Sequence, residues 1–351
     1  MLKYSLKRVV LAFVTAFIIL TITFLLVKSL PIPIQVSSSI NAKWSFYMTQ
    51  VDKGYFTVIE KPAAEHFVPT QKILDSMVIE KTEYFFFNRP ILEQYFSWLR
   101  NIVTRWDWGQ STSLELGADA IRLIGRRLPT TISINILVVI FSVPLGIALG
   151  IYAGLKKNTW IDHTISTLIM IFVSIPGFVV ITFLIYYLSY KTGWLPPSWP
   201  SSTADAQTKA LGYIIPVLAL SFGSICGYGR GVRAELCEVM SSEYLLLART
   251  KGLTKNQAIV RHALRNAFVP ILPSILSEFI GILSGAIILE RLYGIPGVGN
   301  IYMEALNNTP RDYNVLMVDM AIFTIIGLLA GILFDLSYGF IDPRIRMGAK
   351  K

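Results

Sequence analysis

The chain alternates long apolar runs with shorter polar connections. Crossing the hydrocarbon core of a bilayer as a helix takes about 20 predominantly apolar residues. Six runs reach that length: 8–30, 130–155, 159–190, 210–229, 266–289 and 313–339. Only a helix satisfies all its backbone polar groups within one lipid-facing segment, and these runs are too long to be strands of a membrane barrel. The pattern predicts an all-α polytopic membrane protein with six transmembrane helices.

The composition agrees with this prediction. Hydrophobic residues make up 53% of the 351 residues and charged residues 15%, whereas soluble domains carry about 25% charged residues. The apolar runs therefore leave little room for soluble domains.

The positions of the basic residues predict the orientation of the helices, because lysine and arginine are enriched in short cytoplasmic connections. With the N-terminus inside, the short inner segments hold sixteen of the 32 basic residues and the short outer loops hold four; the other twelve lie in the long segment 28–127. We therefore expect both termini in the cytoplasm. The net charge of +10 is then a topology signal, and it does not indicate a nucleic-acid-binding surface.

The first apolar run follows Lys3, Lys7 and Arg8, as the core of a secretory signal would. Its core, 9–27, is longer than the 7–15 residues of a usual signal core, and no small-x-small cleavage site follows before Pro31. We expect residues 1–30 to form an uncleaved N-terminal transmembrane anchor helix.

The connection between the fourth and fifth runs is unusually long and basic. Connections in compact proteins usually have only a few residues, yet this one carries charged residues from Glu243 to Arg265. It is rich in alanine and leucine, and Gly252 in its middle permits a sharp turn. The pattern predicts two short helices outside the membrane.

Two runs in this connection, A-R-T-K-G-L and R-H-A-L-R-N-A, resemble the cytoplasmic coupling loop (the EAA loop) of ABC-importer permeases, in the version of the oligopeptide and dipeptide branch. Other strings also look like this branch: R-R-L-P-T-T-I-S-I-N before the second span, S-I-P-G-F within the third, G-W-L-P-P after it, E-R-L-Y-G-I-P-G-V-G before the last, and D-L-S-Y-G-F-I-D-P-R-I-R near the end. Together the resemblance covers nearly the whole chain except 35–83.

The resemblance implies the membrane-spanning permease subunit of an ATP-driven peptide importer in the bacterial inner (plasma) membrane. The permease core would be 129–342, with the coupling loop at 234–266, and 343–351 would be a basic cytoplasmic tail. The implied partners are a second, homologous permease, two ATPase subunits and an extracytoplasmic peptide-binding protein. ATP and magnesium would be bound by the ATPase subunits, so this chain would be a transport subunit and not an enzyme. Related permeases also carry nickel or another small cargo.

Within the loop, the resemblance implies an ATPase-coupling role for Glu243, Ala248, Arg249, Lys251, Gly252, Arg261 and Arg265. Glu243 matches the start of the family's signature, Ala248 is small enough to lie deep in a groove, and Gly252 is the turn glycine. The I-x-L-P end of the signature is replaced here by 262–265, and Leu-Pro appears only at 272–273. The alternative is a solvated basic loop bound to anionic lipid.

The sequence offers no nucleotide, metal or catalytic site. The stretch 294–299 has the first two glycines of a phosphate loop, but Asn300 and Ile301 stand where lysine and serine or threonine are required. Cys226 and Cys237 lie on the predicted cytoplasmic side, where a disulfide is not expected, and the three histidines lack the spacing of metal ligands. We expect neither a cofactor nor a metal in this chain.

The segment 31–128 is predicted to lie outside the cell, as a small extracytoplasmic insertion between the first two spans. Its portion 35–83 mixes charged and aromatic residues, and we expect a small subdomain with strands around 55–59. This portion would serve either as a docking surface for the binding protein or as a lid on the first two spans. Downstream, one helical face carries Ile91, Tyr95, Trp98, Ile102 and Trp106. Aromatic residues on such a face favour the membrane–water interface, so we expect an interfacial helix.

Three acids lie inside predicted spans. Asp335 is near the cytoplasmic end of the last span, and Asp319 is near its outer end. Glu278 falls near the middle of the fifth span, where an ionised carboxylate is costly unless it faces a cavity or a partner. Glu278 would line the translocation path or, alternatively, take part in helix packing. If Glu278 and Asp319 formed an ion or proton relay, the chain would be a secondary transporter; such a protein is expected to show internal repeats, and none is seen in the sequence.

Overall fold

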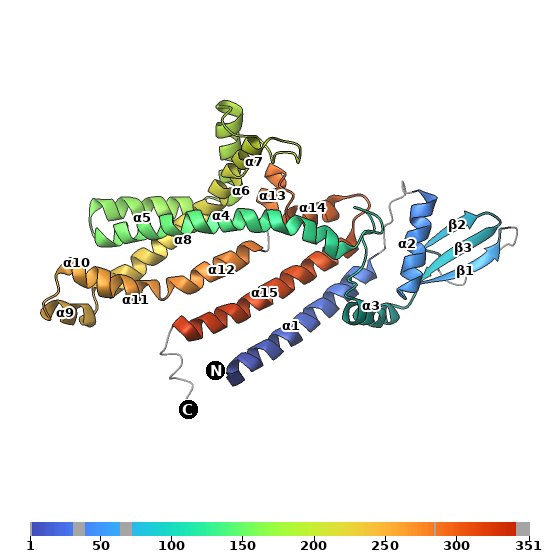
Figure 1. The fold of residues 1–351 in the computed structure, drawn as a ribbon, viewed down its shortest axis with the longest axis horizontal. Helices are drawn as coiled ribbons and strands as arrows, with labels where there is room; N and C mark the ends of the chain where they lie inside the picture. The colour runs from blue at the N-terminus through green and yellow to red at the C-terminus, as the bar shows by residue number, and fades with distance from the viewer. Residues whose placement is uncertain (1, 31–38, 64–71, 284–285, 342–351) are drawn as a thin grey trace. The chain divides into compact units, whose positions relative to one another are not determined.

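The computed structural model describes residues 2–30, 39–63, 72–283 and 286–341 (Figure 1). Its α-helices are α1 (Leu2–Ser29), α2 (Ile40–Asp52), α3 (Ile91–Arg105), α4 (Ala120–Leu155), α5 (Trp160–Val173), α6 (Gly177–Leu184), α7 (Ala206–Gly212), α8 (Ile214–Met240), α9 (Glu243–Thr250), α10 (Lys255–Ala258), α11 (Leu264–Phe268), α12 (Ile271–Leu283), α13 (Ile287–Tyr293), α14 (Val298–Asn307) and α15 (Tyr313–Ile341). Two π-helical segments are η1 (Ile185–Lys191) and η2 (Ile259–Ala263), and the strands are β1 (Phe56–Pro62), β2 (Asp75–Ile79) and β3 (Thr82–Asn88).

The chain divides into two compact units. Unit 1 contains Met1–Ala12, Leu128–Asn300 and Ile326–Lys351, and unit 2 contains Phe13–Arg127 and Ile301–Ile325. Most of the membrane helices and the long connection after α8 belong to unit 1, whereas the small sheet belongs to unit 2.

Within the described residues, four helices are long and apolar enough to cross a membrane: Leu6–Ser29, Ala120–Leu155, Ala206–Met240 and Tyr313–Leu333. A further candidate is the pair Trp160–Val173 and Gly177–Lys191, which is bent by 94°. The bend falls at Pro176 and Gly177, because proline has no N–H to continue the helical hydrogen bonds. These segments confirm a helical multi-pass membrane protein.

The predicted span 266–289 is divided among α11, α12 and α13 in the described residues, so it is not one uninterrupted helix there. The first break lies between Phe268 and Ile271, at Pro270. Residues 284–285 lie outside the described part of the chain. The count of six spanning helices therefore stays a prediction.

Two helices extend well beyond the predicted spans. α4 starts at Ala120 and includes Pro129, and α8 continues past Arg230 and Arg233 to Met240. Charged residues end an apolar run, but they do not end a helix, since arginine is a good helix former. Both helices therefore continue past the ends of their apolar runs, α4 at its N-terminal end and α8 at its C-terminal end.

In unit 1, α4 and α8 approach closely along a row of glycines. A Cβ atom added to Gly146 would lie 2.9 Å from the carbonyl oxygen of Ile225, and one added to Gly150 would lie 2.7 Å from that of Gly229. One further turn along, a Cβ on Gly154 would lie 2.9 Å from the Leu236 side chain. Small residues at four-residue spacing let membrane helices pack backbone to backbone, and here they fix α4 against α8.

Unit 2 contains a three-stranded antiparallel sheet in the order β1-β3-β2, with α2 against it (Figure 1). The strand expected around 55–59 is confirmed as β1, whereas β2 and β3 were not predicted from the sequence. The ring of Tyr47 on α2 stacks on Phe86 of β3 with centroids 4.5 Å apart, and its hydroxyl donates to Asp75 at 3.1 Å. Burial and the Asp75 carboxylate raise the pKa of Tyr47 above its usual range. Aromatic packing therefore supplies the core of a small subdomain.

The expected helix over 91–106 is present as α3 (Ile91–Arg105), but two residues of its aromatic face pack within unit 2, and its interfacial position stays a prediction. Tyr95 and Trp98 are buried and pack on the ring of Phe24 in α1, at centroid distances of 5.5 and 4.8 Å. Trp106 lies after the helix end and points elsewhere, with 66% of its surface exposed. The face with the largest aromatic rings is used for packing inside unit 2.

A buried carboxylate joins two distant segments of unit 2. Asp312, just before α15, is fully buried and accepts hydrogen bonds from the backbone N–H groups of Thr112, Ser113 and Leu114 at 2.9–3.1 Å. The Ser111 hydroxyl donates to the same carboxylate. A buried charge needs such partners to offset its lost hydration, so this network fixes the segment before α4 to the start of α15.

Candidate functional site

The long connection after α8 forms a helical hairpin. α9 begins at Glu243 and ends before Lys251, and Gly252 follows with φ of +97°, a conformation that only glycine adopts without strain. α10 then starts with a capping box, in which Thr254 accepts from the N–H of Gln257 and the Gln257 side chain accepts from the N–H of Thr254. The two predicted helices and the turn at Gly252 are therefore present.

A compact apolar core holds the hairpin to the end of α8. Its buried members are Leu236, Leu245, Ala258, Ile259, Ala263 and Ala267. Ile151 of α4 and Val239 and Met240 of α8 pack against them. Since close-packed interiors transmit displacement with little compression, α9, α10 and the end of α8 should move together.

The hairpin also presents side chains that this core leaves uncovered. Tyr244, Leu246 and Leu247 are 42%, 62% and 56% exposed on α9. Ala248 is half-buried, whereas Glu243, Arg249, Lys251, Gly252, Arg261 and Arg265 are exposed. These exposed apolar residues were not predicted as part of the site, although three consecutive leucines in one helix cannot all face the same core. The exposed set combines apolar and basic side chains, as a protein-docking surface does.

A small cavity lies beneath α9, with a volume of about 200 Å³. Met240, Ser242 and Leu245 line one part of it, and Arg249 and Lys255 bring basic side chains to it. The hairpin surface is therefore indented next to its basic residues.

Glu278 lies on α12 and packs against α4 and α8. The Ser142 hydroxyl donates to its Oε1 at 3.4 Å, and Tyr228 also interacts with its carboxyl group. The other oxygen, Oε2, is buried and has no hydrogen-bond partner among the described residues. A buried carboxylate oxygen without a partner is costly, so the contacts with Ser142 and Tyr228 only partly offset the burial of this group.

The other two acids, Asp319 and Asp335, both lie on α15, away from α12 in the sequence. Asp319 is fully buried within unit 2. The side chain of Asp335 lies outside the described residues. Glu278 and Asp319 therefore belong to different units, and neither is assigned a role by the geometry.

Two buried acids were missed in the sequence. Asp162, in the first turn of α5, is fully buried and accepts from Arg233 of α8, with Nη2 at 2.8 Å. Glu290 on α13 accepts from the Thr131 hydroxyl at 3.2 Å and from the N–H of Asn300 at 2.9 Å. Asp162 and Arg233 are far apart in sequence, so no local pattern announces their ion pair.

Glu290 explains two glycines of the stretch 294–299, namely Gly297 and Gly299. A Cβ atom on Gly297 would clash with the Glu290 carboxyl group, and one on Gly299 would lie 2.8 Å from Cα of Ile287. These two glycines let the loop close over the buried Glu290 carboxyl group. The structure thus gives this loop a structural use.

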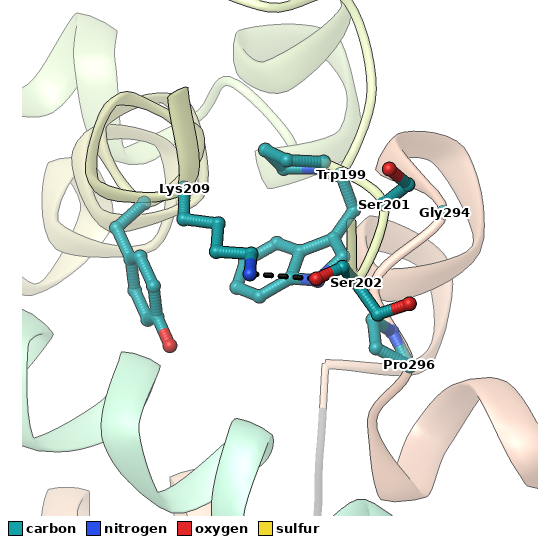
Figure 2. Close-up of a pocket in the computed structure, with 8 residues that line it drawn as sticks. Trp199, Ser201, Ser202, Lys209, Gly294 and Pro296 are labelled. Carbon is teal, nitrogen blue, oxygen red and sulfur yellow. Dashed lines mark hydrogen bonds between the residues drawn. The ribbon is translucent and has the colours of Figure 1, made fainter. Parts of the chain in front are cut away.

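A larger cavity of about 460 Å³ lies between the connection before α7 and the end of α13, within unit 1. Figure 2 shows Trp199 and Pro296 at its wall and Lys209 reaching the carbonyl oxygen of Ser202 at 2.7 Å. The backbone N–H of Trp199 donates to the backbone carbonyl of Tyr293 at 2.7 Å, which fixes this wall of the cavity to α13. Beside it, Asp205 caps α7, and the hydrogen bond from Thr208 lowers the pKa of Asp205.

Comparison with known proteins identifies the family of this chain. Residues 146–347 match the model of the family described as binding-protein-dependent transport system inner membrane component. The chain belongs to this family. It is 28% identical over 351 residues to the dipeptide transport system permease protein DppB of Bacillus subtilis (strain 168), covering all of both chains. It is 32% identical over 286 residues to a probable peptide ABC transporter permease protein of Sinorhizobium fredii, covering 81% of this chain and 89% of that one.

Among solved structures, the chain is similar to the methionine ABC transporter MetNI in inward-facing conformations. The TM-score is 0.51 at 16% identity, over 63% of this chain and 97% of that one. This likeness shows a shared fold. No group of three or more histidine, cysteine, aspartate or glutamate side chains that could hold a metal occurs among the described residues.

Proposed function

We propose that this chain is the membrane-spanning permease subunit of an ATP-driven importer and forms part of the translocation path for peptides. The observation that best supports the proposal is the α9–α10 hairpin at the end of α8, in a member of this transport family. The relatives that match the chain over its length are named as dipeptide and oligopeptide permeases. They make peptides the expected cargo.

The hairpin provides the mechanical link to ATP hydrolysis. Its exposed apolar and basic side chains would dock in a groove of a partner ATPase, and its buried core would carry the motion of that partner to α8 and α4. ATP binding would close two ATPase subunits and open the spans outward; release would reverse the change. In this mechanism the chain makes and breaks no covalent bond, and ATP and magnesium stay on the partners.

The proposed assembly places both termini in the cytoplasm and six helices across the inner membrane. A second, homologous permease completes the path, and an extracytoplasmic binding protein delivers the peptide. Labelling of single cysteines near Gly252 and near Trp199 with an impermeant thiol reagent tests the orientation. The cysteine near Gly252 should react only after the membrane is opened, and reaction of that residue in intact cells would reverse the topology.

Uptake by cells that lack this chain tests the cargo. Labelled di- and pentapeptides should fail to accumulate in the deletion strain and recover when the chain is supplied, whereas nickel uptake should not change. Loss of nickel uptake with normal peptide uptake would show that the cargo is nickel, as in the small-cargo alternative. Uptake that depends on this chain, is abolished by a proton uncoupler and is unaffected by loss of the ATPase subunits would instead support a secondary transporter.

The outer subdomain is a candidate docking surface for the binding protein. Testing that role requires its removal as a whole, because β3 runs to Asn88 and pairs with both other strands. A deletion of 35–83 would cut β3 and expose its phenylalanines. Replacing residues 40–88 by a short linker removes the complete α2 and sheet; unchanged affinity for the binding protein would then refute the docking role.

A further inference from the structure

Helix α3 has three distinct faces. The first face is buried within unit 2 and carries Gln94, Tyr95, Trp98 and Asn101. A second is apolar but exposed: Leu92, Phe96 and Val103 are 66%, 66% and 83% exposed, with the half-buried Leu99 between them. The third is exposed and polar, with Glu93, Arg100 and Thr104. Spacings of four, three and four residues place the members of the second face in one row along the helix.

The position of α3 is fixed by a helix that crosses the membrane. The ring of Phe24 in α1 is fully buried between Tyr95 and Trp98, and the hydroxyls of Thr21 and Tyr95 share a hydrogen bond of 2.7 Å. At 1.5 Å per residue, Thr21 and Phe24 lie within about 12 Å of the C-terminal end of α1. Half the thickness of the hydrocarbon core is about 15 Å. α3 therefore lies at the depth of a single leaflet, next to the end of α1.

The surface of α1 beside this contact is also apolar. Ile22, Leu25 and Leu26 are 52%, 37% and 64% exposed, in the segment Leu6–Ser29 that qualifies as a membrane span. The exposed row on α3 adds a second apolar surface next to this one, since α3 packs on the same part of α1. Its neighbouring polar face, with Arg100, then turns toward water and headgroups, as in helices that lie in the plane of a membrane.

Trp106 gives independent support. It follows α3 as its C-terminal cap in the left-handed conformation, with φ of 54°, where glycine is the usual residue and a bulky side chain is strained. Its ring is 66% exposed and makes an edge contact with Trp108, with centroids 5.6 Å apart. The backbone gains nothing from tryptophan here, but an indole at the end of a lipid-facing row suits the headgroup region.

We propose that α3 lies in the membrane interface at the end of α1, which is the outer boundary in the proposed topology. Leu92, Phe96 and Val103 contact the acyl chains, and Trp106 lies at the level of the headgroups. The occupant of this surface is the bilayer itself, since the adjoining apolar surface of α1 belongs to a spanning segment. The helix thereby anchors α2 and the sheet of unit 2 to the membrane surface.

Spin labels test the proposal in the full-length chain, purified with the subunits that accompany it and placed in phosphatidylethanolamine–phosphatidylglycerol vesicles. Cys226 and Cys237 are first replaced by alanine. Labels at Phe96→Cys and Val103→Cys should collide several-fold more with oxygen than with a water-soluble nickel chelate. Labels at Arg100→Cys and Thr104→Cys, the matched controls on the polar face, should show the reverse ratio.

Two results would overturn the proposal. High collision with the nickel chelate at positions 96 and 103 would place the row in water. Low collision with both reagents, together with immobilised spectra, would mean that a protein subunit covers it. Only the oxygen-rich result at 96 and 103, with the opposite result at 100 and 104, supports lipid contact.

Tryptophan fluorescence gives a second measurement that does not depend on labels. In vesicles with brominated acyl chains, Trp106→Gly should remove part of the quenched intensity while leaving thermal stability equal or higher, because glycine suits the left-handed cap. Trp98→Phe is the control, since Trp98 is only 2% exposed and its loss should leave the quenched intensity unchanged. Equal quenched intensity in the wild-type chain and Trp106→Gly would refute the headgroup position.

Discussion

Replacing Gly150 with alanine should loosen α4 from α8. A Cβ atom at this position would lie 2.7 Å from the carbonyl oxygen of Gly229 and 2.7 Å from Cβ of Val232. Favourable contacts between carbon atoms lie at about 3.5–4.0 Å, so the helices must separate locally by roughly 1 Å. Side-chain rotation cannot relieve the clash, because one of the opposing atoms belongs to the backbone.

The magnitude follows from two opposing effects. Overpacking of this kind costs about 1–3 kcal/mol, and replacing glycine by alanine inside a helix offsets about 0.5–1 kcal/mol of that cost. Gly227 is the matched control on α8, since a Cβ there meets nothing within 4 Å among the described residues. Gly227→Ala should show only the helix gain. The free energies of unfolding of the two variants should therefore differ by about 1–3 kcal/mol.

Thermal unfolding in detergent can measure this difference. Cys226 is only 5% exposed, so a thiol-reactive dye reports unfolding once Cys237 has been replaced by alanine. A change of 1 kcal/mol shifts Tm by about 2–4 °C in domains of 150–250 residues. Gly150→Ala should unfold several degrees below Gly227→Ala at the same heating rate. Equal or higher Tm for Gly150→Ala would refute the close packing of α4 on α8.

Three further predictions concern transport and the buried ion pair. Ala248→Trp should leave the chain inserted but abolish peptide uptake and weaken co-purification of the ATPase; normal ATPase stimulation would contradict the docking role. Glu278→Gln should change uptake or cargo selectivity at unchanged Tm if the carboxylate lines the path, whereas lowered Tm with normal uptake per folded molecule would assign it to packing. Asp162→Asn leaves Arg233, which is 29% exposed, without its carboxylate and should cost about 1.5–3 kcal/mol; a Tm equal to that of the wild-type chain would show that the ion pair contributes little.

The sequence predicts the parts of this fold that depend on local pattern. Hydropathy over about twenty residues located α1, α4, α8 and α15, because burial in lipid requires a continuous apolar segment. The hairpin was predicted because a helix-forming run on each side of Gly252 leaves a turn as the simplest arrangement. The positive φ of Gly252 is the physical basis of that prediction.

The features that the sequence did not predict depend on which way a helix face points or on a partner that is distant in the sequence. The aromatic row of α3 could equally face lipid or protein, and only the contact with Phe24 decides in favour of protein. The ion pair of Asp162 and Arg233 joins α5 to α8, and each residue alone resembles a charge at the end of a span. β3 had a visible signal in its run of aromatic residues at 84–87, but its partners are set by pairing with β1 and β2.

Helix α8 is the element through which motion of the hairpin can reach the membrane core. Within its last three turns, Leu236 belongs to the hairpin core, Arg233 binds Asp162 of α5, and Val232 faces Gly150 of α4. One turn earlier, Tyr228 donates to the carbonyl of Ser274 on α12 at 3.3 Å and reaches Glu278. Coupling between distant sites can be carried by contiguous packed elements, and α8 alone contacts the hairpin, α4, α5 and α12. A displacement of the hairpin by an ATPase would therefore shift α4, α5 and α12 together, and the environment of Glu278 would change with it.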